Sequence, residues 1–187
     1  MVQALSRSIT LEEFLARPET KPANEYIDGI IRQKPMPQGK HSLLQRELTF
    51  ALTMAFRADK AAQVFPELRC TFGACSIVAD IAVFKTERIP RDDNGEIANV
   101  FKLDPDWSIE ILSPNQSHTR VIRNILHCLD YGAEMSWLID PQEACIFVYQ
   151  ADKSVQVFDQ QAQNLPTPAF AQSLTLSGDK IFAWLKN

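Results

Sequence analysis

Apolar residues recur every three or four positions in two stretches of the chain, the spacing that places them on one face of a helix. The first stretch runs from His41 to about Phe56, and its apolar stripe is Leu44, Leu48, Leu52 and Ala55. The second runs from Ser117 to Asp130 with Val121, Ile125 and Leu129, and Gly132 follows its end. The pattern predicts two long helices. Shorter ones are expected after the capping box Thr10-Leu-Glu-Glu13 and over Asp179–Lys186.

Elsewhere the apolar positions alternate or form short runs, which is typical of strands. Asp28-Gly29 between two apolar pairs predicts the turn of an N-terminal β-hairpin. The other expected strands are Val64–Cys70, Ser76–Phe84, Trp107–Leu112, Ser136–Ile139, Cys145–Tyr149 and Ser154–Phe158. The order of helices and strands favours an α/β or α+β domain with a mixed sheet and a helix on each face.

The 187 residues are enough for one domain with its own core, and we expect a single domain over 1–187. Its core would span about residues 10–150, with a C-terminal strand and helix extension over 151–187. Hydrophobic residues make up 45% and charged residues 22%, which excludes a disordered chain. None of the six glycines forms a phosphate-binding loop pattern.

The net charge of −4 excludes a strongly basic nucleic-acid binder, although a local basic groove remains compatible with it. No run of about 18 apolar residues predicts a membrane span. The first residues carry no signal-like segment, so we expect a cytoplasmic protein. We therefore expect Cys70, Cys75, Cys128 and Cys145 to be reduced, buried thiols, since their spacing matches no strong zinc pattern.

Two carboxylates interrupt strongly apolar strands. Asp80 lies within Ile77–Phe84, and Glu110 lies within Trp107–Leu112. A carboxylate in such a place is costly unless it is paired, hydrogen-bonded or bound to a metal. If the two strands are neighbours, both acids can converge on one Mg²⁺ or Mn²⁺ ion, which prefer oxygen ligands. The alternative is two unrelated acids at exposed edges of a sheet.

Three further residues carry weaker signals. His41 at the head of the first long helix either caps that helix or points into a site. Arg120 and Arg123, near the start of the second, are either solvated or in contact with phosphate.

Five segments together resemble the Uma-type family of restriction endonucleases, a branch of the PD-(D/E)XK nuclease superfamily. They cover about residues 10–150. These segments are Glu25–Gly29, His41, Val78–Val83, Ser108–Pro114 and Tyr131–Pro141.

The resemblance implies a restriction-endonuclease-like core with a mixed sheet of four or five strands. It also implies that Asp80 and Glu110 hold Mg²⁺ (or Mn²⁺), that the carbonyl of Ile111 adds a ligand, and that DNA is the substrate. Glu25 and His41 would be neighbours of this site. Because nucleases of this fold often pair, a homodimer is expected as well.

The chain differs from the family pattern at one position that matters for activity. The signature lysine that usually follows the acid by two residues is Leu112 here. Many members instead carry it in the second long helix, eight residues before the terminal glycine, where this chain has Asn124. Asparagine can hold a water molecule but brings no positive charge. We therefore expect a weak or inactive endonuclease, and the rival hypothesis is a non-catalytic relative that binds nucleic acid or protein through the same cleft.

Overall fold

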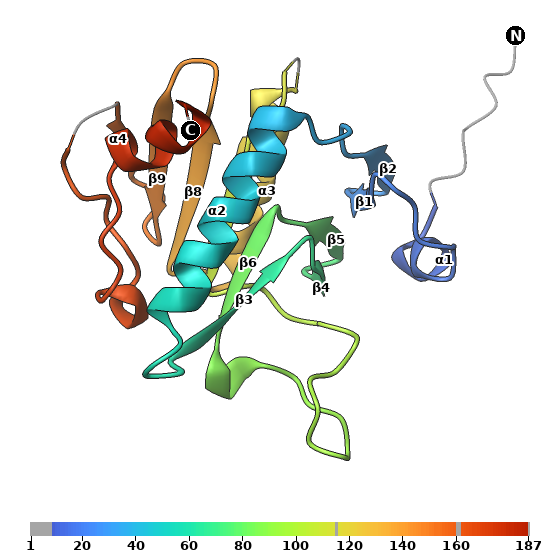
Figure 1. Ribbon diagram of the computed structural model, residues 1–187. Helices are drawn as coiled ribbons and strands as arrows, with labels where there is room; N and C mark the ends of the chain where they lie inside the picture. Colours follow the sequence, from blue (N-terminus) through green and yellow to red (C-terminus); the bar gives the residue numbers. More distant parts are fainter. Residues whose placement is uncertain (1–8, 115, 160–161, 187) are drawn as a thin grey trace, which may run out of the picture.

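Two β-sheets form the centre of the structure, a computed structural model that describes residues 9–114, 116–159 and 162–186 (Figure 1). The larger sheet has six strands in the order β10-β9-β8-β7-β6-β3, and the smaller has four in the order β2-β1-β5-β4. Only β7 and β8 pair in parallel among these strands, so the larger sheet is mixed. The predicted α+β class is confirmed, with one sheet more than expected.

The strand bounds are β1 Asn24–Ile27, β2 Ile30–Gln33, β3 Ala62–Pro66, β4 Arg69–Phe72, β5 Cys75–Val78, β6 Ile81–Lys85, β7 Trp107–Ile111, β8 Met135–Asp140, β9 Cys145–Gln150 and β10 Val155–Phe158. The α-helices are α1 Leu11–Leu15, α2 Gly39–Ala55, α3 His118–Tyr131 and α4 Gly178–Ala183. Short 3₁₀ turns cover Thr86–Arg88, Ala169–Ala171 and Trp184–Lys186.

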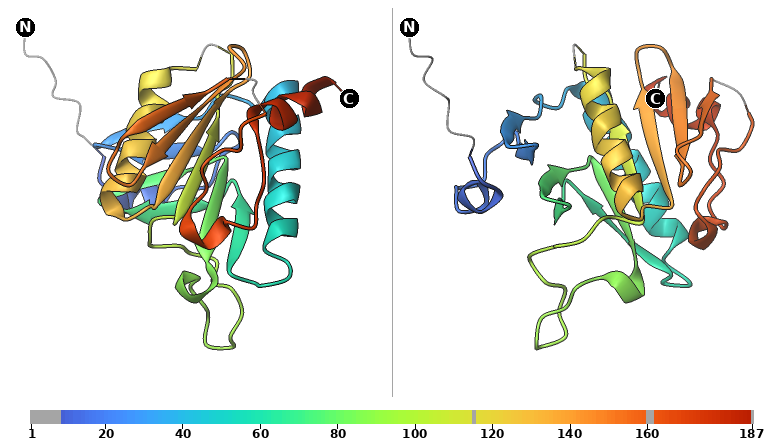
Figure 2. Two further views of the ribbon diagram at one scale, coloured as in Figure 1. Left: turned by 90° about the vertical axis from the view of Figure 1, so that its left-hand side faces the viewer. Right: turned by 180° about the vertical axis from the view of Figure 1, so that it is seen from behind.

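The long helices cover opposite faces of the six-stranded sheet, as Figure 2 shows. The apolar stripe of α2 packs with Trp107, Ile109 and Ile111 of β7, and α4 joins the same cluster. The stripe of α3 packs with Ala82 and Phe84 of β6 on the other face. Because side chains alternate along a strand, the neighbours of the β7 apolar residues, including Glu110, face α3. The predicted C-terminal extension therefore contributes to the central core.

The predicted strands over Val64–Cys70 and Ser76–Phe84 are wrong in one respect, because each is divided between the two sheets. The first is interrupted after Pro66, where Glu67 adopts a left-handed φ of 50°. The second is interrupted at Ala79 and Asp80. Alternating apolar residues predict extended backbone but do not reveal that the chain changes sheet between two of them. Asp80 thus lies between β5 and β6, and not inside a strand.

The predicted N-terminal hairpin is confirmed as β1 and β2. Asp28 and Gly29 take left-handed φ values of 50° and 77° in its turn, which glycine adopts without strain. Strand β1 also pairs with β5, with Tyr26 opposite Ser76. The hairpin is thereby held beside the break that contains Asp80.

No helix in residues 9–114, 116–159 and 162–186 is long and apolar enough to cross a membrane.

All four cysteines are free and buried, and we expect them to react slowly in the folded protein. Burial raises the pKa of Cys70 to about 12 and raises the pKa of Cys128 well above its ordinary value, so little thiolate is present near neutral pH. A thiol assay with and without denaturant checks this. Four thiols should appear on unfolding without reductant. Fewer than four, or bound zinc by elemental analysis, would contradict it.

The outer strand β10 leads us to expect a dimer or larger assembly. It is an edge of the six-stranded sheet, and Val155 and Val157 on it are 45% and 57% exposed. An edge with exposed apolar residues is a surface on which a second chain can pair. Sedimentation at micromolar concentration should give at least twice the chain mass, and Val157→Lys should shift it toward the monomer. A monomeric wild type would refute the expectation.

Candidate active site

Asp80 occupies the point at which the chain leaves the smaller sheet for the larger one. Its Oδ2 accepts a hydrogen bond of 2.7 Å from the backbone N–H of Ile111. Its own carbonyl accepts one of 2.8 Å from the side chain of Gln45. These bonds replace strand pairing at the break, which explains how a carboxylate that is 2% exposed is tolerated there.

Glu110 lies on β7, the strand beside β6. Ile81 pairs with Ile109, so the residue before Ile81 and the residue after Ile109 are brought together. Glu110 is 4% exposed and shares a face of the sheet with Ser108. The two acids singled out in the sequence are therefore close neighbours, at the edge between the two sheets.

The ammonium group of Lys34 lies between them. Its Nζ is 2.6 Å from Oδ1 of Asp80 and 3.6 Å from Oε2 of Glu110, and it also donates to the carbonyl of Val78 over 2.7 Å. Sequence reasoning missed Lys34, which directly follows β2 and precedes Pro35. Nothing in its local pattern separates it from a surface lysine. Only the pairing of the hairpin with β5 brings it to Asp80, 46 positions away in the chain.

Burial and charge act differently on the two carboxyl groups. Burial alone would raise the pKa of Asp80, but the Lys34 ammonium and the His41 ring outweigh it and hold that pKa well below its usual range. Burial raises the pKa of Glu110 well above its usual range, and the Asp80 and Glu25 charges add to this rise while Lys34 opposes it. The site thus contains one firmly ionised carboxylate and one that binds a proton readily.

Glu25 and Asn124 form a second, hydrogen-bonded pair next to Asp80, Glu110 and Lys34. Glu25, on β1, accepts a hydrogen bond of 3.0 Å from the backbone N–H of Val78. Asn124, on α3, donates its amide to both Glu25 oxygens at 3.3 Å. Among the described residues Asn124 forms no hydrogen bond with Asp80 or Glu110, so we expect it to act on them through Glu25. The cation expected near position 124 is supplied instead by Lys34.

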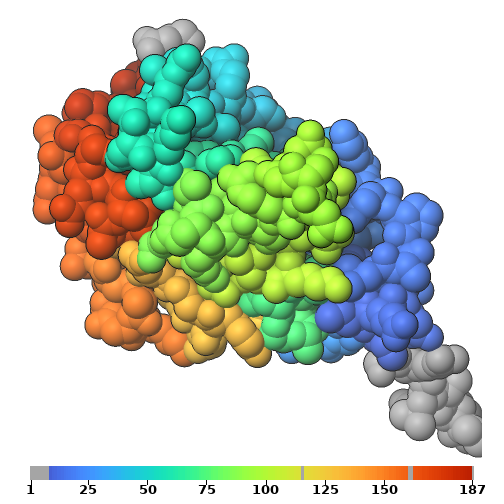
Figure 3. Space-filling view, turned by 90° about the horizontal axis from the view of Figure 1, so that it is seen from below, coloured from blue at the N-terminus to red at the C-terminus, as the bar shows by residue number. Residues whose placement is uncertain are grey.

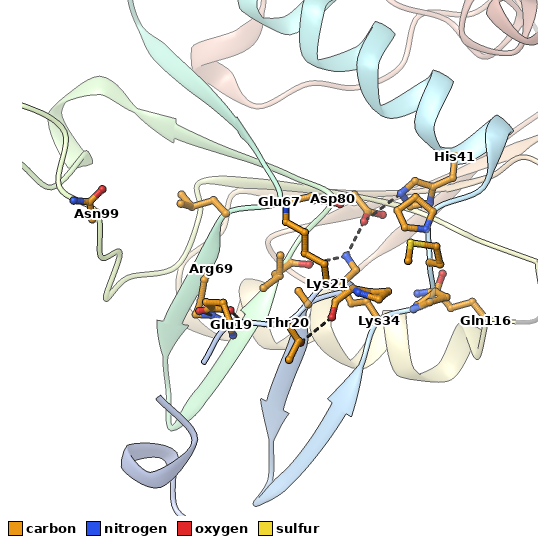
Figure 4. Close-up of a pocket in the computed structure, with 17 residues that line it drawn as sticks. Glu19, Thr20, Lys21, Lys34, His41, Glu67, Arg69, Asp80, Asn99 and Gln116 are labelled. Atoms are coloured by element: carbon orange, nitrogen blue, oxygen red, sulfur yellow. Dashed lines mark hydrogen bonds and ion pairs between the residues drawn. The ribbon is translucent and has the colours of Figure 1, made fainter. Parts of the chain in front are cut away.

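His41 adjoins the site from the first turn of α2. Its Nε2 is 3.5 Å from Asp80 Oδ1, and its Nδ1 is 3.2 Å from the Ser113 hydroxyl. The ring is buried, so it does not cap the helix end in solvent. Figure 4 shows Lys34 and His41 approaching Asp80 from different elements.

A small chamber lies on the Glu110 side of Lys34. Its volume of about 10 Å³ is near the minimum for one water molecule. The Nε of Arg120 and the Oδ1 of Asn124 border it, and both are buried atoms without a hydrogen-bond partner. One water could accept from the first and donate to the second. Arg123 is exposed on the same helix and does not border this chamber.

Lys34, His41 and Asp80 also line a larger cavity of about 560 Å³. Its walls come from the segments around Pro22 and Pro35, from the turn between β3 and β4, and from Asn99 on the loop before β7 (Figure 4). The acidic centre is thus reached through a cavity large enough for a small ligand.

The donor set fits a hard divalent cation. Three buried carboxylates, Asp80, Glu110 and Glu25, surround one ammonium, which leaves an excess of negative charge. Within the described ranges no cluster of three His, Cys, Asp or Glu residues is arranged to hold a metal by itself. Mg²⁺ needs no such cage, because it is usually held by one or two carboxylates, water and substrate phosphate. Asp80 and Glu110 provide that pair.

Comparisons with known proteins identify the family of the chain. A family model described as "Putative restriction endonuclease", Uma2, matches residues 11–177. A crystal structure from Anabaena variabilis ATCC 29413, described as "a putative nuclease belonging to DUF820", is 55% identical with a TM-score of 0.93. The match covers 95% of this chain and 99% of that one. No curated protein matches. On the extent of the family match, the chain belongs to the Uma2 family.

Proposed function

We propose that this protein is a Mg²⁺-dependent endonuclease that hydrolyses phosphodiester bonds of DNA. One observation carries the proposal. Two buried carboxylates, Asp80 and Glu110, meet a single ammonium, that of Lys34, and Asp80 and Lys34 line a cavity of about 560 Å³. Carboxylate pairs of this kind suit Mg²⁺ or Mn²⁺, and the ammonium suits a phosphate group.

Asp80, Glu110 and the carbonyl of Ile111 would hold the cation. When bound, it would polarise the scissile phosphate and lower the pKa of an attacking water molecule. The backbone N–H of Ile111 donates to Asp80, which holds this end of β7 beside the acids.

Lys34 takes the part of the lysine that the family signature places elsewhere. Its flexible side chain can turn from the carboxylates to a phosphate oxygen once a divalent cation takes over their charge. A positive group at that oxygen stabilises the charge that develops in the transition state.

Glu25, Asn124 and His41 are positioning residues in this scheme. Glu25 fixes the backbone before Asp80 through Val78, and Asn124 orients Glu25. His41 lies against Asp80 on the other side. The rival is a non-catalytic protein that binds its partner through the same cavity, and loss-of-function variants of the acids distinguish the two.

Asp80→Asn and Glu110→Gln should each abolish cleavage supported by Mg²⁺ or Mn²⁺, because each removes a charged ligand. Assays on plasmid and oligonucleotide DNA measure the cleavage rate, and calorimetry measures the affinity for Mn²⁺. We expect a rate loss of at least about 10²-fold and clearly weaker Mn²⁺ binding. Asp93→Asn, an exposed loop acid, is the matched control and should resemble wild type. DNA binding without cleavage by wild type in either metal would favour the rival.

Lys34→Met should separate catalysis from metal binding. Loss of a preorganised cation typically lowers the rate by about 10²–10³-fold. Mn²⁺ affinity should rise, since the ammonium no longer competes for Asp80 and Glu110. Lys102→Met, at an exposed lysine that does not line the cavity, is the matched control and should have little effect.

Thermal unfolding of Lys34→Met with and without Mn²⁺ tests whether the variant folds. The metal should recover stability lost through unpaired buried carboxylates. Wild-type cleavage rates in Lys34→Met would disprove the role of Lys34.

A further inference from the structure

We infer that the nucleic acid enters this site as an unpaired strand, with one nucleotide inside the 560 Å³ cavity, and not as an intact duplex. The inference rests on the proposed function and names its substrate class. Three features of the cavity carry it: the burial of the acids, the size and apolar character of its walls, and the charges at its mouth.

The acids lie too deep for a phosphate on the outside of a rigid duplex. The side chains of Asp80 and Glu110 are 3% and 5% exposed, and that of Lys34 is 12% exposed. Asp80 and Lys34 line the cavity, so a phosphodiester must enter it to reach them. In a duplex the bases next to this phosphate are stacked and paired, so they cannot move into the cavity with it. An unpaired nucleotide can enter the cavity together with its phosphate.

The cavity has the size and lining for a nucleotide. Its volume of about 560 Å³ falls in the range of small-molecule sites. Its walls are mostly apolar, formed by Pro22, Ala23, Pro35, Met36, Pro37, Leu68 and Val78. Such walls suit the apolar faces of a base and the sugar, while phosphate groups prefer charged or polar surroundings.

The charged residues that line the cavity do not provide enough unpaired positive charge to bind both backbones of a duplex. Arg69 lines the cavity, but its guanidinium is bound to both Glu19 oxygens at 2.7 Å and to the Asn24 carbonyl. The charges of Arg69 and Glu19 offset each other in this pair, and Glu67, which also lines the cavity, would repel flanking phosphates. Glu67 and Asn99 can instead bond the polar edge of an extruded base. The lysines that line the cavity are the exposed Lys21 and the partly buried Lys34 beside Asp80, enough for one strand.

Three substrates of one sequence test this inference: a single strand, the perfect duplex, and a duplex with an internal unpaired bubble. With wild type and Mn²⁺, we expect the single strand to be cut at least about tenfold faster than the duplex, and the third substrate to be cut at its bubble. Fluorescence anisotropy with Asp80→Asn, which should not cut, measures binding of the same set. We expect Asp80→Asn to bind the single strand more tightly than the duplex.

Ala23→Trp should fill the cavity and weaken single-strand binding at least about tenfold, while Ala151→Trp, in an exposed turn outside the cavity, should not. Circular dichroism and Mn²⁺ affinity confirm that the acidic centre of Ala23→Trp is intact.

Equal cleavage of duplex and single strand, or unchanged single-strand binding by folded Ala23→Trp, would overturn the inference and leave the proposed catalysis standing. Preferential binding of the single strand without cleavage of any substrate would overturn the catalysis and support the substrate class.

Discussion

The contact between the Lys34 ammonium and the Asp80 carboxylate joins the two sheets of this protein. Lys34 follows the hairpin of the smaller sheet, and Asp80 is the residue at which the chain crosses into the larger one. Glu110 approaches the same nitrogen from β7. Figure 3 shows the N-terminal segment lying against the surface beside the loop before β7. The site therefore exists only when the hairpin is docked on β5.

This arrangement is costly in the absence of a further cation. Asp80, Glu110 and Glu25 are all buried, while Lys34 and the neighbouring His41 ring are the groups that offset their charge. Burial is the main cause of the raised pKa of Glu110, and the neighbouring Asp80 and Glu25 charges add to it, so a proton there relieves part of the repulsion. Perturbed carboxyl groups of this kind cluster at functional sites. A divalent cation would relieve the imbalance while using the same oxygen atoms.

The sequence was most informative where a local pattern has a single outcome. The stripes of α2 and α3 and the hairpin turn at Asp28 predicted what the structure contains. The two acids in apolar runs lie close together, as expected for paired strands, but Asp80 lies between two strands and not inside one. The division of two predicted strands between the sheets was not predictable, because the local sequence of an extended segment does not show which strand it will pair with. Lys34 was missed for the same reason, because strand pairing between distant parts of the chain brings it to Asp80. Asn124 was placed near the site, but its bond to Glu25 was not foreseen.

Anomalous diffraction from crystals soaked in Mn²⁺ would locate a divalent cation relative to these groups. We predict one strong peak in contact with the carboxylates of Asp80 and Glu110, with the Lys34 side chain withdrawn from both. Lys34 still bridging the two carboxylates, with no peak beside them at a Mn²⁺ concentration that supports cleavage, would show that these acids are not the metal site.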